Sequence, residues 1–111
     1  MLIASILMVA MAPAPAGGVD ATRDAFTKCL RGHLKKSLEA KMGEAEYEMS
    51  LKGACDSERE AFRGAIIAGN KASGDSAADA ADNAEMQIED YHASFTDKFK
   101  DYSASNTLPA D

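Results

Sequence analysis

The chain has 111 residues, of which 46% are hydrophobic and 27% charged, and this composition is typical of one globular domain rather than a disordered chain. Its net charge of −6 disfavours nucleic acids and anionic lipid as partners, because both are bound through clustered lysine and arginine. Alanine is the commonest residue, tryptophan is absent and aromatics are few, which favours helices over strands.

Residues 1–16 are predicted to be a cleavable signal peptide. An uncharged apolar run over residues 1–12 is followed by Pro13 and small residues, the layout of a secretory signal. We expect cleavage after Ala16, so that the mature chain begins at Gly17. The run is shorter than the roughly 20 residues of a membrane span, although a buried N-terminal core helix is an alternative. The prediction is a periplasmic or secreted protein without stable membrane insertion after cleavage.

The first helix is predicted from Asp20 or Thr22, both suitable N-caps, to about Met42. Gly43 is expected to end it in the left-handed conformation. Its apolar side chains recur every four residues and form one inward stripe, which consists of Phe26, Leu30, Leu34, Leu38 and Met42.

A second helix is predicted over about residues 44–68, followed by a loop over 69–74. Its stripe consists of Tyr47, Leu51, Cys55, Phe62 and Ile66. Asp75 or Ser76 is expected to cap a third helix that runs to about Tyr102. The stripe of this helix alternates mostly between steps of four and three and consists of Ala77, Ala81, Ala84, Ile88, Tyr91, Phe95, Phe99 and Tyr102. The helical domain is thus expected over residues 17–103, with a flexible tail over 104–111.

The two cysteines, Cys29 and Cys55, are predicted to form a disulfide. An exported chain enters an oxidising compartment, and the cysteines are equidistant from residue 42, next to the expected reversal at Gly43. Residues equidistant from the turn of an antiparallel helical hairpin face each other. The predicted fold is therefore all-α: a disulfide-clipped antiparallel helical hairpin plus a third amphipathic helix, a small three-helix bundle. A redox, metal-binding or intermolecular role of the cysteines is the alternative.

The segment Cys29-Leu30-Arg31, followed by Ala54-Cys55-Asp56-Ser57-Glu58-Arg59 behind a signal peptide, resembles small exported two-cysteine helical proteins of alphaproteobacteria. The resemblance covers about half of the mature chain. It implies an exported address and a helical hairpin, and it implies no activity.

Candidate metal ligands lie on the third helix. Glu89 and His92 are three residues apart and share a helix face, and Glu85 lies one turn before Glu89. Di-metal bundles need two such pairs with further glutamates, and the chain has one, so a chance pair on a charged helix is the competing interpretation. The acidic residues of this helix form either a solvated face or a surface for a basic partner or divalent cations.

No nucleophile elbow, catalytic triad or phosphate-binding glycine loop occurs, so the chain is not expected to be an enzyme or to hold a cofactor. The leading hypothesis is a non-enzymatic binding or interaction protein of the cell envelope that binds a protein partner. The partner is basic if the acidic third helix is the binding surface. Oligomers could form through helix packing. The alternatives are a metal-binding or metal-responsive periplasmic protein that uses the acidic third helix, and a secreted enzyme inhibitor.

Overall fold

The computed structural model describes residues 18–110 and folds them into four α-helices without a strand. These are α1 (Val19–Glu39), α2 (Glu44–Gly53), α3 (Asp56–Ala72) and α4 (Ala77–Ser105). The all-α prediction is confirmed. The predicted signal peptide and its cleavage site at Ala16 and Gly17 lie outside the described residues. Within residues 18–110, no helix has the length and apolar character that crossing a membrane requires.

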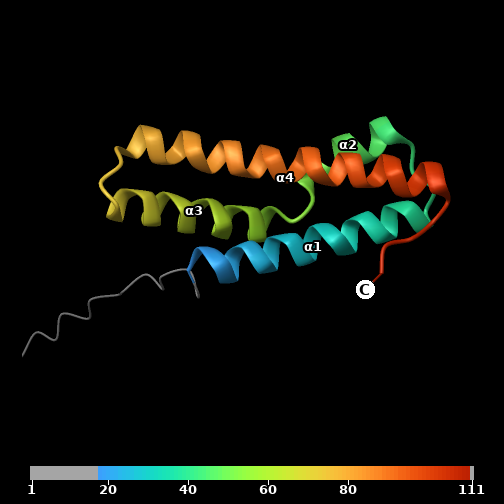
Figure 1. Ribbon diagram of the computed structural model, residues 1–111, viewed down its shortest axis with the longest axis horizontal. Helices are drawn as coiled ribbons and strands as arrows, with labels where there is room; N and C mark the ends of the chain where they lie inside the picture. The colour runs from blue at the N-terminus through green and yellow to red at the C-terminus, as the bar shows by residue number, and fades with distance from the viewer. Residues whose placement is uncertain (1–17, 111) are drawn as a thin grey trace, which may run out of the picture.

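Helix α4 runs along the whole bundle, and the other helices pack around it (Figure 1). Helices α2 and α3 follow one another along α4 in the opposite direction, with α3 beside its first half and α2 beside its second. Helix α1 is parallel to α4 and contacts α3 as well as α4. Beyond α4, residues 107–110 return toward α1.

The segment predicted as one helix over residues 44–68 is two helices, so residues 18–110 form four helices and not three. Helix α2 ends at Gly53, and Cys55 adopts a left-handed conformation with φ 62° before α3 begins. A residue in this region interrupts a right-handed helix, and crowding of its Cβ against the backbone makes the conformation uncommon for residues other than glycine. At 100° per residue, the buried side chains of Tyr47, Leu51, Phe62 and Ile66 still fall within an arc of about 100°, so the apolar pattern continues across the break.

The chain reverses between α1 and α2, as predicted, but its left-handed residue is Lys41 and not Gly43. Lys41 has φ 52° and donates its backbone N–H to the carbonyl of Leu38, and the N–H of Met42 reaches the carbonyl of Ser37. This pair of bonds is a Schellman motif, which satisfies the last carbonyls of α1. Gly43 is extended and is the N-cap residue of α2.

The predicted limits of α1, α3 and α4 shift by a few residues. Helix α1 begins at Val19 with Gly18 as its N-cap, and Thr22 is buried inside the helix instead of capping it. Helix α3 continues to Ala72, through most of the predicted loop. The cap of the last helix is confirmed, because the Ser76 hydroxyl accepts a hydrogen bond of 3.1 Å from the backbone N–H of Asp79.

One hydrophobic core joins all four helices. Its centre is a group of aromatic rings in which Phe26 of α1 stacks on Phe62 of α3 and meets Tyr91 of α4 edge-on, with centroid distances of 5.7 and 6.0 Å. The other buried members of the core come from every helix and are Leu30, Leu34, Tyr47, Leu51, Ile66, Ala84, Ile88, Phe95 and Phe99. Most members of the predicted stripes therefore face inward, whereas Ala77 at the start of α4 is exposed.

Candidate functional site

The predicted disulfide between Cys29 and Cys55 is confirmed. It joins the middle of α1 to the break between α2 and α3, with the two Cα atoms 6.0 Å apart. Cys55 is the left-handed residue at the break and packs against the core. The bridge therefore fixes the point at which the chain changes from α2 to α3 against the surface of α1.

Glu58 lies beside this disulfide in the first turn of α3. Its carboxylate and the two sulfur atoms lie within 4.8 Å of one another, the one such set of three potential metal ligands among residues 18–110. In the oxidised protein the two sulfur atoms are bonded to each other, so they offer no thiolate to a metal.

The three metal-ligand candidates on α4 have different surroundings. Glu85 forms an ion pair with Arg63 of α3. Glu89 and His92 line an open hollow of about 410 Å³ between α2 and α4, together with the carboxylates of Glu48 and Asp97. No third ligand atom joins those of Glu89 and His92 within 4.8 Å in the described part of the chain.

The surroundings of His92 favour its neutral form. Its Nε2 atom is buried without a hydrogen-bond partner among residues 18–110, and its ring lies 6.2 Å from that of Phe26. Burial lowers the pKa of His92 below its usual 6.5, and the positive charges of Arg59 and Lys52 lower it further. Glu89 opposes this shift without reversing it.

The second histidine belongs to a stack of rings at the other end of the core. Tyr47 lies between His33 and Phe99, with centroid distances of 5.5 and 4.1 Å. The Tyr47 hydroxyl is buried, and burial raises the pKa of Tyr47 to about 12. The pKa of His33 is lowered by burial and by the charge of Lys36.

His33 also contacts a serine, which sequence reasoning missed. Its Nε2 atom lies 3.0 Å from the hydroxyl of Ser50 on α2. A catalytic serine needs a base that is itself oriented by a third group. Besides its contact with His33, the Ser50 hydroxyl donates a hydrogen bond of 2.8 Å to the carbonyl of Tyr47. The contact therefore ties α1 to α2. Positions 33 and 50 are equidistant from the turn between α1 and α2, so only the register of this helical hairpin could have indicated the contact of His33 with Ser50.

Both histidines should make the fold less stable in mild acid. A histidine with a lowered native pKa binds fewer protons in the folded than in the unfolded chain, so the free energy of unfolding falls as pH drops below 6.5. Each histidine can contribute a slope of at most about 1.4 kcal/mol per pH unit. We expect urea unfolding to show lower stability at pH 5.5 than at pH 7.5, above the range in which ordinary carboxylates titrate.

The variant His92→Gln should flatten this pH dependence, and combining it with His33→Gln should remove most of the remainder. Stability that is equal at the two pH values in the unmodified protein would contradict the prediction.

A stripe of carboxylates covers the solvent side of α4. This acidic stripe consists of Asp79, Asp82, Glu89 and Asp90, all exposed. No ion pair within residues 18–110 involves any of the four. Met86 lies in the middle of the stripe with 62% of its surface exposed. The stripe thus combines unneutralised negative charge with one accessible apolar side chain.

Comparisons of the chain with models of protein families, with curated proteins and with solved structures found no match.

Proposed function

We propose that this chain is an exported, non-enzymatic interaction protein that binds a basic protein partner through the acidic stripe of α4. The observation that carries the proposal is the stripe itself. Its carboxylates are exposed and are not paired with the bases of the described chain. Charge of this kind steers a partner of opposite sign and sets the register of the complex.

Met86 supplies the apolar anchor of this surface. Asp82, Met86 and Glu89 are separated by one helical turn each and so share a face. A flexible methionine among charged residues suits a binding surface, because its unbranched side chain adapts to the partner while the surrounding charges select it. Export is supported by the signal-like residues 1–16 and by the disulfide, which persists in oxidising compartments.

Site-specific photo-crosslinking tests this proposal. A photoreactive amino acid replaces Met86, and the full chain is exposed in an envelope extract of its native host. We expect one discrete adduct with a basic protein, and the adduct should disappear in the charge-reversed variant Asp82→Lys/Glu89→Lys and at high salt, because exposed charges are screened. The same photoreactive residue at Met49 of α2, which is 79% exposed, is the matched control and should give no such adduct. Identical adducts at both positions, or none at either, would refute the proposal.

A further inference from the structure

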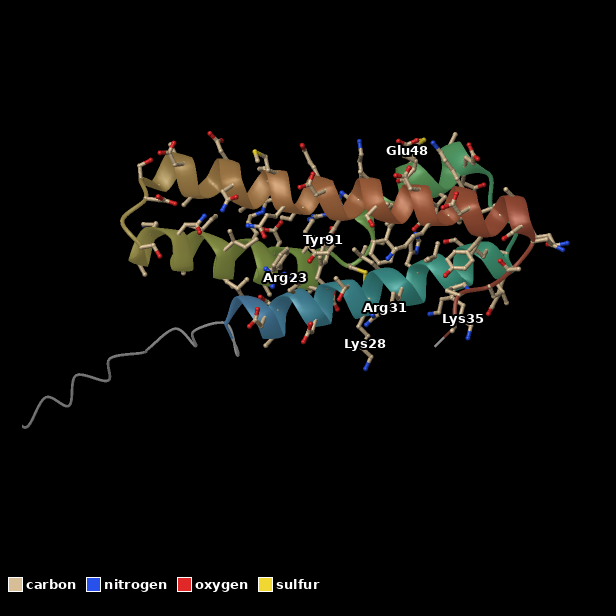
Figure 2. All side chains as sticks on the ribbon, viewed as in Figure 1. Arg23, Lys28, Arg31, Lys35, Glu48 and Tyr91 are labelled. Atoms are coloured by element: carbon tan, nitrogen blue, oxygen red, sulfur yellow. A yellow bond between two sulfur atoms is a disulfide. The ribbon has the colours of Figure 1, made fainter. Side chains whose placement is uncertain are left out.

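The solvent face of α1 carries positive charge, in contrast to that of α4. Lys28, Arg31 and Lys35 lie one turn apart and project from α1 away from the bundle (Figure 2). They lie on the side of the helix opposite to the buried stripe of Phe26 and Leu30. Helix α1 has five lysine and arginine residues against three acidic residues, whereas α4 has two against seven.

These three cations surround an open hollow of about 530 Å³, the basic hollow, which is also lined by Gly32, Pro109 and Ala110. Gly32 contributes no side chain, and a Cβ added there would meet nothing within 4 Å, so this part of the hollow is open. Pro109 and Ala110 form its other wall where the chain returns along α1. The hollow is therefore bounded by charge on one side and by the short non-helical segment after α4 on the other.

Two of the cations have no counter-charge in the described part of the chain. Lys28 and Arg31 form no ion pair with any residue in the range 18–110, whereas Arg23, Arg59 and Arg63 are paired with nearby carboxylates. A guanidinium group can bind a carboxylate through two parallel hydrogen bonds, and a lysine adds a point charge. The chemistry of the basic hollow is that of a carboxylate receptor.

We propose that the basic hollow binds a short acidic peptide segment of a partner protein. Along the helix axis, Lys28 and Arg31 are separated by about 4.5 Å, and carboxylates at alternate positions of an extended peptide lie about 6.7 Å apart. Because both basic side chains are long and flexible, two such carboxylates can each reach one of these two cations. The proposal concerns a surface of opposite sign from the acidic stripe and stands independently of the proposed function.

A peptide fits the basic hollow better than an anionic membrane. A membrane is an extended surface that also repels the rest of a chain whose net charge is −6. A short peptide contacts only the hollow, where the local charge is positive, and the wall at Pro109 and Ala110 limits the contact to a narrow ligand.

The test uses the full disulfide-bonded chain and a fluorescein-labelled hexapeptide of alternating aspartate and serine, with binding measured by fluorescence anisotropy. A counterpart with lysine in place of aspartate should not bind. The variant Lys28→Glu/Arg31→Glu should weaken binding of the acidic peptide by about ten-fold or more, since it removes two charge-assisted contacts. The control Lys71→Glu/Lys100→Glu makes the same change of net charge at exposed positions away from the hollow and should change affinity by less than about two-fold.

A further variant separates shape from charge. Gly32→Leu fills the basic hollow without altering any charge and should also weaken peptide binding, while circular dichroism confirms that every variant remains helical. Equal weakening by both charge variants would show non-specific attraction and overturn the proposal. Three other results would also overturn the proposal that the hollow binds an acidic peptide. They are absence of peptide binding, binding to phosphatidylglycerol vesicles alone, and a salt-sensitive dimer that Lys28→Glu/Arg31→Glu abolishes.

Discussion

Removal of the Cys29–Cys55 bridge should lower the free energy of unfolding by about 3.5 kcal/mol. The bridge closes a loop of 26 residues. In the chain-entropy model, opening a loop of this length raises the conformational entropy of the unfolded chain and so stabilises the unfolded state by that amount. A domain of this size is stable by only about 5–15 kcal/mol, so the loss is a large fraction of the total. Urea unfolding of the double variant Cys29→Ser/Cys55→Ser against the oxidised protein measures it.

The position of the bridge predicts where the reduced chain should lose structure. Cys55 is the left-handed residue between α2 and α3, so the reduced chain should also lose helical content locally at this break. A thiol reductant should reproduce the loss of stability in the unmodified protein and have no effect on the double variant. Equal stability of the oxidised and reduced forms would contradict the structural role of the bridge.

Replacement of Phe26 by alanine should destabilise the fold by about 3–5 kcal/mol, the range for an aromatic ring removed from a packed core. The ring is fully buried and contacts rings of both α3 and α4, so its loss leaves a cavity where three helices meet. Thermal and urea unfolding measure the change. Phe26→Leu, which retains most of the volume, should cost less than about 1.5 kcal/mol.

An exposed position provides the comparison for this variant. Met49 is 79% exposed on α2, and Met49→Ala should change stability by no more than about 0.5 kcal/mol. If Phe26→Ala has an effect as small as that of Met49→Ala, the aromatic group is not the centre of the core.

The helices and the disulfide could be predicted because each leaves a local signal. Apolar residues with helical spacing identify buried faces, and the turn near Gly43 agreed with the midpoint of Cys29 and Cys55. The break at Cys55 left no such signal in the apolar pattern, because Leu51 and Phe62 keep nearly the same helical phase on either side of it. A glycine at position 53 and acidic residues at 56 and 58 are the local cues that could have indicated a new helix.

The surroundings of the two histidines could not be predicted from spacing. The stack of His33, Tyr47 and Phe99 joins α1 and α2 to α4, which is distant from both in sequence, so the stack depends on how the helices pack. The same holds for His92, whose proximity to Arg59 and Lys52 arises from the break between α2 and α3. Burial, which lowers both pKa values, is a tertiary property, and so is the proximity of His92 to the charges of Arg59 and Lys52.

The left-handed turn at Lys41 lies inside the segment that the disulfide closes into a covalent ring. Lys41 is exposed, as a protease that cuts after lysine requires. A single cut there breaks the backbone between α1 and α2, yet both resulting pieces stay joined through the two sulfur atoms. This part of the molecule can therefore lose a peptide bond without losing a fragment, and the nick would become visible as two shorter chains only after reduction.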